Sequence, residues 1–339
     1  MTCVLRLGIL GTARIAQGFA EGVAGSALVR IDAVASRSAD AAAAFADRHA
    51  ITRAHGSYEA LLADGQLDAV YIPLPNSLHA PWTERALRAG LHVLCEKPLT
   101  VTLAEAQSLF TVAKASGRVL LEAYPYRYQP QTLRLRQLID EGAIGDIRLV
   151  QACFGFSLPA GADIRLDPAL GGGALLDAGC YAVSLARLVA GRRPLAVLAQ
   201  ARWSDSGVDM ALTGTVHYEG GAVAQIGCAM DAAVHRQALV LGSAGVIETD
   251  YLNHTHAQRP GVLRLRRGVG WDAPLESVAF DQGNGFRFEA EHFARQVFEP
   301  GLRDDGDTRL SLENMATLEA LLRSAREGRS VDVTPVLMP

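Results

Sequence analysis

The sequence predicts an α/β protein with two domains. A doubly wound parallel sheet is expected over residues 1–123, followed by an α+β domain over 124–339 with a large, mostly antiparallel open sheet. Up to residue 123, short apolar runs alternate with segments of helical periodicity, which is typical of a parallel sheet covered by helices. From Ile147 onward, apolar and polar residues alternate with period two between glycine turns, which is typical of antiparallel strands.

The apolar runs of the first domain are predicted strands: Val4–Leu10, Leu28–Ala35, Ala69–Ile72, His92–Cys95 and Val119–Ala123. The alanine-rich stretch Ala39–Ala46 is predicted to be a helix packed closely on the sheet, because alanine is the best helix former. Thr102 and Glu105 form a capping box that opens another helix, and Gly117 is a stop signal for it.

The second domain is expected to begin at the aromatic and proline-rich stretch Tyr124–Pro130. A helix through about Asp140 follows. Period-two alternation then predicts a series of strands: Val150–Phe156, Met210–Tyr218, Ala222–Met230, Ala238–Leu241, Val246–Thr249 and Val262–Leu265. Two helices, Phe286–Phe298 and Leu310–Arg326, are expected to close the chain.

The composition excludes several classes of protein. The 339 residues are 49% hydrophobic and 20% charged with a net charge of −4, which suits a globular protein with a large core and gives no footprint for nucleic acid or an anionic membrane. The sequence contains no run of about 18 or more uncharged apolar residues, so no transmembrane helix is predicted. The five widely spaced cysteines are interpreted as small buried side chains in a reducing cytoplasm rather than as disulfides or a zinc site.

The first strand leads into a tight turn of the dinucleotide-binding type. The residues Gly11, Thr12, Ala13, Arg14 and Ile15 fit the pattern G-x-G-x-x-G/A with alanine at the second glycine. In such a turn, backbone N–H groups and a helix N-terminus face a diphosphate. The alternative interpretation is an ordinary tight turn between a strand and a helix.

The second strand ends in Ser36 and Arg37, where an NAD site usually carries an acidic residue for the ribose 2′-hydroxyl. An arginine and a hydroxyl here favour the 2′-phosphate of NADP, with NAD still possible. Asp32 lies too early in the strand to replace the missing acid. The alternative is a solvated arginine beside a helix cap at Ser38.

The stretch from Ala69 to Leu99 is a predicted βαβ unit whose two strands end in polar residues and proline. Ligands bind at the carboxyl ends of strands in open α/β sheets, so Lys97 is placed where a substrate is expected. A tight turn here is compatible with a cis Lys97–Pro98 bond, although only about 5–6% of X–Pro bonds are cis. Further candidates for the cofactor site lie at the same edge: Leu74, Pro75, Asn76, His79 and Glu96. His79 has an equal alternative as a structural histidine before Pro81.

A glycine run, Gly171–Gly173, interrupts the pattern of the second domain and is predicted to open a helix. Asp177 and Tyr181 are then one turn apart on one face of that helix. A polar pair in an apolar stretch needs partners if it is buried. The alternative is a helix-terminal aspartate and a core tyrosine with a satisfied hydroxyl.

These motifs together resemble the Gfo/Idh/MocA oxidoreductase family. The resemblance rests on the Gly11 turn, Pro75-Asn76-x-x-His79, Glu96-Lys97-Pro98, Gly142-x-x-Gly145 and the glycine run with Asp177 and Tyr181, in family order over nearly the whole chain. Tyrosine at 181 resembles the branch with dihydrodiol dehydrogenase, D-xylose 1-dehydrogenase and glucose–fructose oxidoreductase. The resemblance implies a Rossmann domain, a cis peptide before Pro98, and a homodimer or homotetramer formed through the open sheet.

The implied activity is hydride transfer between NADP, or NAD, and a hydroxyl of a sugar or cyclic polyol. Tyr181 is expected to exchange the proton, Lys97 to lower the pKa of that tyrosine, and Asp177 to orient Lys97 or the substrate. Candidates for the pocket wall are Tyr126, Arg127, Phe156 and Arg165. The alternatives are a reductase of keto-sugars, including nucleotide-linked ones, and a non-catalytic sensor that binds the dinucleotide.

A metal site was tested against His254 and His256, which face the same way on a predicted strand. No third ligand is evident near them in the sequence, so no metal is expected.

Overall fold

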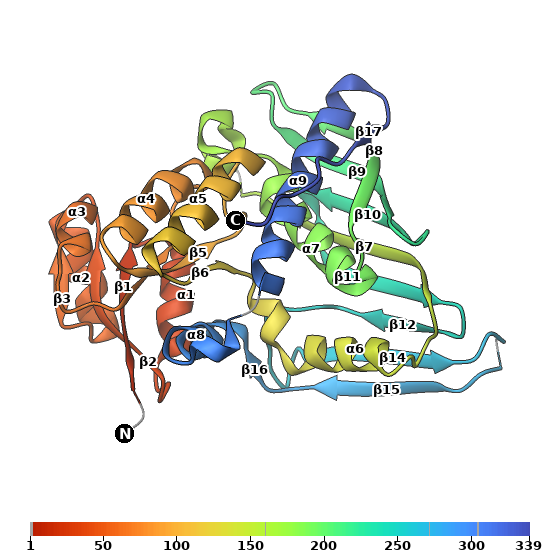
Figure 1. Ribbon diagram of the computed structural model, residues 1–339, viewed down its shortest axis with the longest axis horizontal. Coiled ribbons are helices and arrows are strands. Elements are labelled where there is room, and N and C mark those ends of the chain that lie inside the picture. The colour runs from red at the N-terminus through yellow and green to blue at the C-terminus, as the bar shows by residue number, and fades with distance from the viewer. Residues whose placement is uncertain (1–2, 160, 271, 304) are drawn as a thin grey trace.

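The computed structural model describes residues 3–159, 161–270, 272–303 and 305–339. Two sheets lie side by side with helices between them (Figure 1). The predicted α/β class is confirmed, because a parallel sheet is followed by a larger, mostly antiparallel one.

The N-terminal sheet has six parallel strands in the order β3-β2-β1-β4-β5-β6 among the described residues. This order is that of a dinucleotide-binding Rossmann sheet, whose topology reverses between β1 and β4. The strands are β1 (Leu5–Leu10), β2 (Val29–Ala35), β3 (Arg53–His55), β4 (Ala69–Ile72), β5 (His92–Glu96) and β6 (Leu120–Ala123). The predicted strands are therefore present, and the short edge strand β3 is an addition.

The helices around this sheet begin and end at residues of known capping chemistry. Ser38 and Ser57 accept hydrogen bonds at the N-termini of their helices, and Thr102 and Glu105 form the predicted capping box. Gly117 ends that helix in the left-handed conformation, as predicted. The helices are α1 (Arg14–Val23), α2 (Ala39–His49), α3 (Tyr58–Leu62), α4 (Asn76–Arg88) and α5 (Leu103–Ser116).

The C-terminal sheet has nine strands in the order β15-β14-β12-β11-β7-β10-β9-β8-β17 among the described residues. β7 and β10 pair in parallel, and the other neighbours are antiparallel. The strands are β7 (Ile147–Ser157), β8 (Pro194–Trp203), β9 (Asp209–Tyr218), β10 (Val223–Ala229), β11 (Asp231–Gly242), β12 (Gly245–Thr249), β14 (Gly261–Arg267), β15 (Leu275–Phe280) and β17 (Val331–Asp332). A small two-stranded sheet pairs β13 (His254–Thr255) with β16 (Gly283–Asn284).

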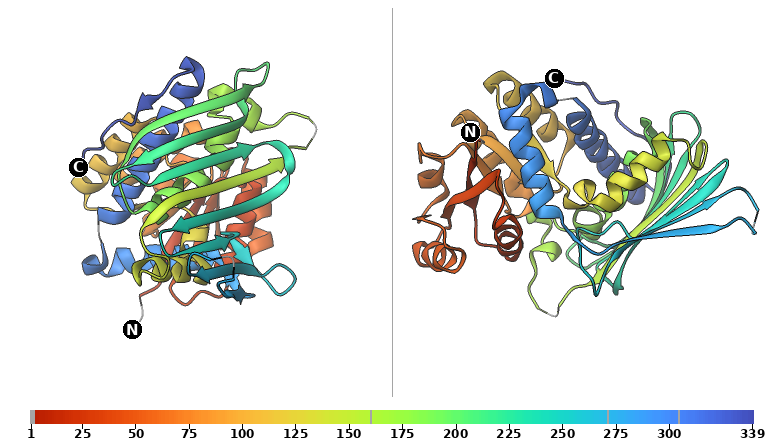
Figure 2. Two further views of the ribbon diagram at one scale, coloured as in Figure 1. Left: turned by 90° about the vertical axis from the view of Figure 1, so that its right-hand side faces the viewer. Right: turned by 90° about the horizontal axis from the view of Figure 1, so that it is seen from below.

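Helices cover one face of the C-terminal sheet and leave the other face open (Figure 2). The covering helices are α6 (Pro130–Asp140), α7 (Cys180–Ala190) and α9 (Asp305–Glu327). On β7 the covered face carries Val150, Ala152, Phe154 and Phe156, as the alternation predicted. The open face bears a cavity of about 870 Å³ whose lining includes Gln151, Gln225 and Gln237.

Helix α8 (Gly285–Phe298) follows the strands of the C-terminal sheet in the sequence but packs against the N-terminal sheet. Phe293 and Ala294 belong to the same apolar cluster as Leu7 and Ile9 of β1. The ring of Phe286 meets that of Phe19 on α1 with centroids 5.8 Å apart. The boundary between two domains at residue 123 stays a prediction. A boundary there assigns α8 to the second domain, although α8 contributes to the core of the first.

The segment after the glycine run differs from the prediction. Leu175–Gly179 (η4) forms a π-helical turn, and α7 begins only at Cys180. Asp177 and Tyr181 therefore do not lie on one regular α-helical face, because the wider turn rotates the first residue relative to the second. The helical stretch 168–190 is long and apolar enough to span a membrane, but 83% of the tested window is buried inside the protein. Burial of this extent is what a core helix requires.

The remaining short helices lie in loops. They are η1 (Pro125–Tyr128), η2 (Ile164–Leu166), η3 (Pro168–Leu170) and η5 (Pro300–Leu302).

Candidate active site

The turn after β1 has the geometry that a bound diphosphate needs. Gly11 has φ of +117°, and a Cβ at this position would lie 3.2 Å from Cδ2 of Leu74, so the turn favours glycine. The N-terminus of α1 begins at Ala13 without a side-chain cap, and its first turn has no acidic residue. Ala13, Arg14 and Ile15 are exposed. An uncapped, exposed helix N-terminus with free N–H groups suits the phosphates of a dinucleotide.

Two further predicted cofactor residues lie at the same edge of the sheet. Ser36 follows β2 directly and accepts a hydrogen bond from the backbone of Ser38, which caps α2. Arg37 between them is exposed and contacts the hydroxyl of Tyr58. Asp32 is buried and pairs with Arg30 at 2.5 Å, so it is not available to a ribose at the strand end.

The Lys97–Pro98 bond is cis, as predicted. The turn that contains it is tied to the end of β4 by His79, whose Nδ1 lies 2.7 Å from the carbonyl oxygen of Pro98 and whose Nε2 lies 2.8 Å from that of Leu74. His79 is fully buried, and burial lowers its pKa to about 4 despite these carbonyls. The structure therefore places this imidazole behind the turn and supports its structural interpretation.

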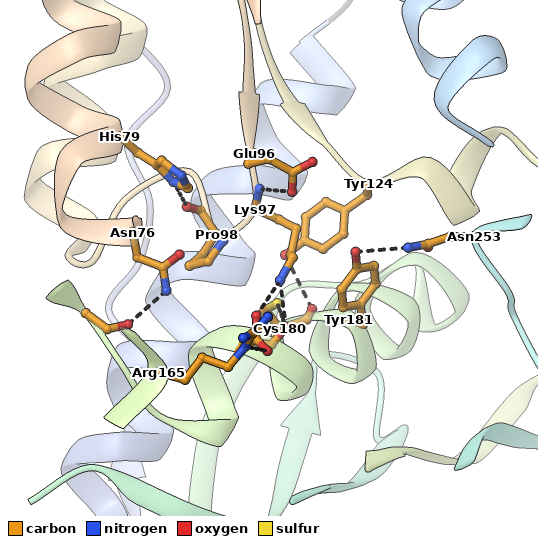
Figure 3. Close-up of polar contacts among 12 residues, drawn as sticks. Asn76, His79, Glu96, Lys97, Pro98, Tyr124, Arg165, Cys180, Tyr181 and Asn253 are labelled. Atoms are coloured by element: carbon orange, nitrogen blue, oxygen red, sulfur yellow. Dashed lines mark hydrogen bonds and ion pairs between the residues drawn. The ribbon is translucent and has the colours of Figure 1, made fainter. Parts of the chain in front are cut away.

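Asn76 and Glu96 also make contacts within the protein (Figure 3). The amide of Asn76 donates to the carbonyl oxygen of Gly171 at 2.8 Å and so connects α4 with the glycine run. Glu96 is buried and accepts hydrogen bonds from the Tyr71 hydroxyl at 2.6 Å and the Lys97 N–H at 3.2 Å. Burial raises the pKa of the Glu96 carboxyl.

Lys97 and Asp177 meet between the two sheets. The Lys97 ammonium donates to the backbone carbonyl of Asp177 at 2.7 Å and to its carboxylate at 3.1 Å. The other carboxylate oxygen accepts from Nε of Arg165 at 2.6 Å. Burial is the largest single effect and lowers the pKa of Lys97, but the negative groups around it, of which Asp177 is the strongest, together outweigh burial and raise the pKa. Lys97 is therefore held as an ammonium ion.

The glycine run makes this meeting possible. Gly173 has φ of +118°, and a Cβ there would lie 2.1 Å from Oδ1 of Asp209. The other carboxylate oxygen of Asp209 accepts from the N–H of Leu175 at 2.7 Å, so Asp209 caps the start of the π-helical turn. The N–H of Asp177 then donates to the carbonyl oxygen of Gly173 at 3.1 Å.

Tyr181 lies beside Lys97, as predicted. The Lys97 nitrogen is 5.0 Å from the centre of the Tyr181 ring, and the side chain is 6% exposed. Lys97 lowers the pKa of Tyr181, as predicted, but burial raises it by more than the charges of Lys97 and Arg236 lower it, so the net shift is upward. Tyr181 is therefore a protonated phenol at neutral pH, with a cation on its ring face.

The four predicted wall residues have different surroundings. The guanidinium of Arg165 lies 5.6 Å from the ring centre of Phe156, so these two flank Asp177. Tyr126 is fully buried and donates or accepts a hydrogen bond with Ser184 at 2.9 Å, and its ring lies 6.0 Å from that of Tyr181. Arg127 is not brought to the cluster, because its buried guanidinium pairs with Asp307 at 2.6 Å. The sequence did not show this partner, which lies 180 residues away.

Comparisons with known proteins agree with this geometry. A family model described as an oxidoreductase family with an NAD-binding Rossmann fold matches residues 5–124, and one described as a GFO/IDH/MocA C-terminal domain matches residues 132–248. D-xylose 1-dehydrogenase (NADP(+)) 2 of Haloferax volcanii is 38% identical over 330 residues, which are 97% of this chain and 100% of that protein.

This chain belongs to the Gfo/Idh/MocA oxidoreductase family.

Other members of the family are similar over a comparable length. The dTDP-3,4-didehydro-2,6-dideoxy-alpha-D-glucose 3-reductase of Streptomyces violaceoruber is 41% identical over 332 residues, 95% of each chain. A solved 3-ketoreductase from Actinomadura kijaniata in complex with NADP and TDP-benzene has a TM-score of 0.87 at 32% identity, covering 95% of this chain and 98% of its own. This Gfo/Idh/MocA protein is thus an NAD(P)-dependent oxidoreductase rather than a non-catalytic sensor.

Two polar residues beside Tyr181 in this oxidoreductase were missed by sequence reasoning. The Asn253 amide donates to the Tyr181 hydroxyl oxygen at 3.1 Å, and the Arg236 guanidinium lies 4.1 Å from the centre of the Tyr181 ring. Arg236 lies on the same face of β11 as Ala238 and Val240, which are buried. The one signal in the sequence was an arginine in register with the apolar positions Ala238 and Val240.

The two histidines examined for metal have separate neighbours. The ring of His254 packs on Phe286 with centroids 4.5 Å apart, and Nδ1 of His256 lies 2.9 Å from Oε1 of Gln258. Within the described ranges, no group of three or more potential ligand residues is placed to hold a metal ion.

Proposed function

We propose that this oxidoreductase uses NADP(H) to oxidise a hydroxyl of a sugar or cyclic polyol, as an aldose 1-dehydrogenase or a dihydrodiol dehydrogenase-like enzyme. The observation that carries the proposal is the meeting of Lys97, Asp177 and Tyr181, which come from two distant parts of the chain. The relatives named D-xylose 1-dehydrogenase (NADP(+)) and trans-1,2-dihydrobenzene-1,2-diol dehydrogenase support the substrate class.

The dinucleotide is assigned to the carboxyl edge of the N-terminal sheet, within residues 1–123. The Gly11–Ile15 turn and the N-terminus of α1 would hold the diphosphate, and Ser36 with Arg37 would bind the 2′-phosphate. The segment after β4 would contact the dinucleotide between the diphosphate and Lys97 through Leu74, Pro75 and Asn76. His79 and Glu96 stabilise the turn at Lys97 and Pro98 through hydrogen bonds within the protein. When bound, the nicotinamide supplies the acceptor or donor of the hydride.

The proton chemistry is assigned to Tyr181 and Lys97. The buried Tyr181 phenol holds a proton at neutral pH, so it acts as general acid when a carbonyl is reduced. In the oxidative direction the step starts from the Tyr181 phenolate, which takes the proton of the substrate hydroxyl and becomes the phenol. The Lys97 ammonium stabilises negative charge on either oxygen, and Asp177 holds that ammonium in place with two hydrogen bonds.

The substrate is assigned to the side of the cluster where Phe156 and Arg165 lie. Arg165 is partly buried. Its guanidinium forms an ion pair with the Asp177 carboxylate and lies over the Phe156 ring. An apolar ring beside polar donors suits a sugar, which presents C–H and O–H groups together. Tyr126 supports the Tyr181 ring instead of contacting the substrate, and Arg127 has no assigned role in binding.

A second candidate function is the reduction of a keto-sugar, including a nucleotide-linked one. It is favoured by the 41% identity to the dTDP-keto-sugar 3-reductase of Streptomyces violaceoruber. The same residues serve both reactions, because hydride and proton transfer are reversible.

The test is a panel of substrates in both directions. Aldoses, including D-xylose, and a trans-dihydrodiol are mixed with NADP⁺, a dTDP-linked keto-sugar is mixed with NADPH, and NADPH absorbance is followed. We expect turnover with an aldose or dihydrodiol, and we expect Lys97→Met and Tyr181→Phe each to lower kcat by about 10²- to 10⁴-fold. The chain's other lysine, Lys114, lies exposed on α5 and gives a matched control in Lys114→Met.

The outcomes separate the candidates. Reduction of the keto-sugar without oxidation of any aldose or diol would replace the first function by the second. Full turnover in the Lys97→Met variant would contradict the role of Lys97 in either reaction.

We further propose that a second copy of the chain covers the open face of the C-terminal sheet, giving a homodimer or homotetramer. Support comes from the breadth of this uncovered face and from Leu198, which is 48% exposed there (Figure 2). A cytoplasmic location is proposed as well, because all five cysteines are free thiols and Cys3 is exposed.

A further inference from the structure

Arg236 is a buried cation in a cage of aromatic rings. Its guanidinium carbon lies 4.1 Å from the ring centre of Tyr181, 4.6 Å from Tyr251, 4.9 Å from Phe154 and 5.4 Å from Tyr126. The residue is 7% exposed and sits on β11 directly opposite Phe154 of β7. The rings come from four separate elements, so the cage exists only in the folded protein.

This guanidinium has few polar partners for a buried charge. Nη1 donates to the side-chain oxygen of Asn253 at 3.1 Å, whereas Nε and Nη2 are buried without a hydrogen-bond partner among the described residues. None of the ion pairs in the described part of the chain includes Arg236. Ring faces attract a cation, but burying an unpaired charge remains costly. Because burial of this unpaired charge destabilises the fold, its position beside Tyr181 suggests a functional role.

The single hydrogen bond of Arg236 fixes the direction of the next one. A guanidinium has only donors, so the Asn253 amide must turn its oxygen toward Arg236. The NH₂ group of the same amide then faces Tyr181 and donates to its hydroxyl oxygen at 3.1 Å. The backbone carbonyl oxygen of Asn253 accepts hydrogen bonds from the Gln129 side chain and from the N–H of Gly285. These bonds fix the backbone that carries the Asn253 side-chain amide.

The Tyr181 oxygen accepts a hydrogen bond from Asn253. The Lys97 ammonium lies 5.0 Å from the centre of the Tyr181 ring and has no acceptor capacity, so it cannot take the hydroxyl proton either. No described residue accepts a hydrogen bond from the Tyr181 hydroxyl. Its proton is thus left for an acceptor that the protein does not provide, which is the oxygen of a bound substrate.

We propose that Arg236 and Asn253 are positioning residues that hold the Tyr181 oxygen as a hydrogen-bond acceptor and leave its proton for the substrate. The proposal rests on the function proposed above for Tyr181 and extends it to two residues outside the motifs. In reduction, the Tyr181 O–H bond breaks, the proton bonds to the substrate carbonyl oxygen, and the electron pair stays on the phenolate. Asn253 keeps its hydrogen bond to that phenolate, and the Arg236 charge stabilises it. Oxidation reverses each of these changes.

The charged and titratable groups that face Tyr181 set the pH behaviour. Lys97 and Arg236 favour the phenolate, whereas burial, Glu96 and Cys180 oppose it. Other titratable side chains near Tyr181 or Arg236 are Tyr71, Tyr124, Tyr126, Tyr251 and His254. Loss of Arg236 removes one of the two cations and leaves the opposing groups in place. The pKa of Tyr181 is then expected to rise further.

The decisive variant is Asn253→Asp. An aspartate has the same shape and gains an ion pair with Arg236, so a purely structural role predicts a stable and active enzyme. A carboxylate cannot donate to Tyr181 and accepts its proton instead, so our proposal predicts a kcat lower by about tenfold or more with an unchanged KM for NADP⁺. Asn284→Asp is the matched control, because Asn284 only caps α8 and an aspartate also serves as a cap.

Arg236 is tested by the pH profile of NADP⁺-dependent oxidation of D-xylose, or of the best substrate in the panel above. Arg236→Met removes the charge from the cage and is expected to move the acidic limb of kcat/KM upward by about one pH unit. Arg236→Lys keeps the charge and is expected to restore most of the position of that limb. If Arg236→Met fails to fold, as circular dichroism would show, Asn253→Asp still decides the proposal.

Failure of this inference is distinct from failure of the proposed function. Tyr181→Phe that retains full activity would overturn the proposed function itself. An inactive Tyr181→Phe, together with wild-type kcat in Asn253→Asp and an unmoved pH profile in Arg236→Met, would leave the function intact and overturn the positioning role.

Discussion

At the scale of single residues, the choice of dinucleotide depends on a charge at the end of β2. Arg37 is exposed there, contacts Tyr58, and has no acidic neighbour at the strand end, since Asp32 is occupied by Arg30. The contact with Tyr58 is to a neutral hydroxyl, so the exposed Arg37 guanidinium is expected to pair with a 2′-phosphate, for which arginine has the matching geometry.

Arg37→Gln is expected to reduce the preference for NADP⁺ over NAD⁺ by about tenfold or more, because a charge-assisted contact to the 2′-phosphate is lost. The ratio of kcat/KM values for the two dinucleotides measures it. Arg30→Gln removes the same charge at the opposite end of β2, away from the carboxyl end that Arg37 follows. An equal change in both variants would mean that only the general charge of the surface matters.

His79 links the catalytic turn to the pH dependence of stability. Burial lowers its pKa from about 6.5 to about 4, so the unfolded state takes up a proton at a higher pH than the folded state. The stability that the neutral imidazole contributes is complete above pH 6.5 and is lost as the pH falls toward 4. Its full extent is roughly 3 kcal/mol.

His79→Gln retains an amide donor for one of the two carbonyls but does not titrate. The free energy of unfolding of the wild type, minus that of this variant, is therefore expected to fall by roughly 3 kcal/mol between pH 7 and pH 4. Urea titrations at several pH values measure this difference. A difference that stays flat over this range would show that His79 is not the group that titrates.

At the scale of elements, the π-helical turn at Leu175–Gly179 determines where Asp177 points. The turn depends on Gly173, whose φ of +118° and close approach to Asp209 leave no room for a side chain. Asp209 in turn is buried, and burial raises its pKa to about 6. The glycine run is thus a structural requirement of the site and supplies none of its chemistry.

Gly173→Ala is expected to cost about 2 kcal/mol or more of stability and to lower kcat, because the strained turn can no longer direct Asp177 toward Lys97. The matched control is Gly191→Ala at the C-cap of α7, which also has positive φ but has nothing within 4 Å of the added Cβ. That variant is expected to cost about 1 kcal/mol with normal activity. Thermal unfolding and steady-state kinetics of both variants test the comparison.

The elements that local chemistry specifies were predictable from the sequence. The capping box at Thr102, the stop at Gly117 and the alternation on β7 each depend on residues that are close in the chain. Strand β8 was missed because Leu198 is exposed on the open face and a register shift between Pro194 and Ala196 breaks the alternation of apolar and polar positions. The π-helical turn was missed because its cap, Asp209, lies 34 residues beyond Leu175.

The same limit applies to the site. Lys97, Asp177 and Tyr181 belong to motifs with recognisable spacing, so the sequence could nominate them. Asn253 and Arg236 reach Tyr181 only through the folding of distant strands, and the partner of Arg127 is also remote. The effect of Lys97 on the pKa of Tyr181 was predicted, whereas the larger, opposite effect of burial was not, because the sequence shows charges more readily than burial.

At the scale of the whole molecule, the open sheet face is expected to control assembly. Gln225 and Gln237 are exposed on β10 and β11, on either side of Gln151 on the central strand β7. Lysines at both positions of each copy would bring like charges into an interface that uses this face of both copies. Gln225→Lys combined with Gln237→Lys is therefore expected to give a folded monomer, while Ser108→Lys on α5 leaves the assembly unchanged. Analytical ultracentrifugation distinguishes these outcomes, and a wild type that is monomeric would refute the proposed assembly.

The position of α8 also constrains how the protein is made. Phe19 and Tyr71 stack at 3.9 Å in a layer that α8 completes, yet α8 is encoded near the end of the chain. During translation, this layer stays uncovered until Phe298 has left the ribosome, long after the Rossmann strands have emerged. A nascent chain thus presents an apolar surface to chaperones for most of its synthesis, and a stop codon before Gly285 would release a fragment prone to aggregation.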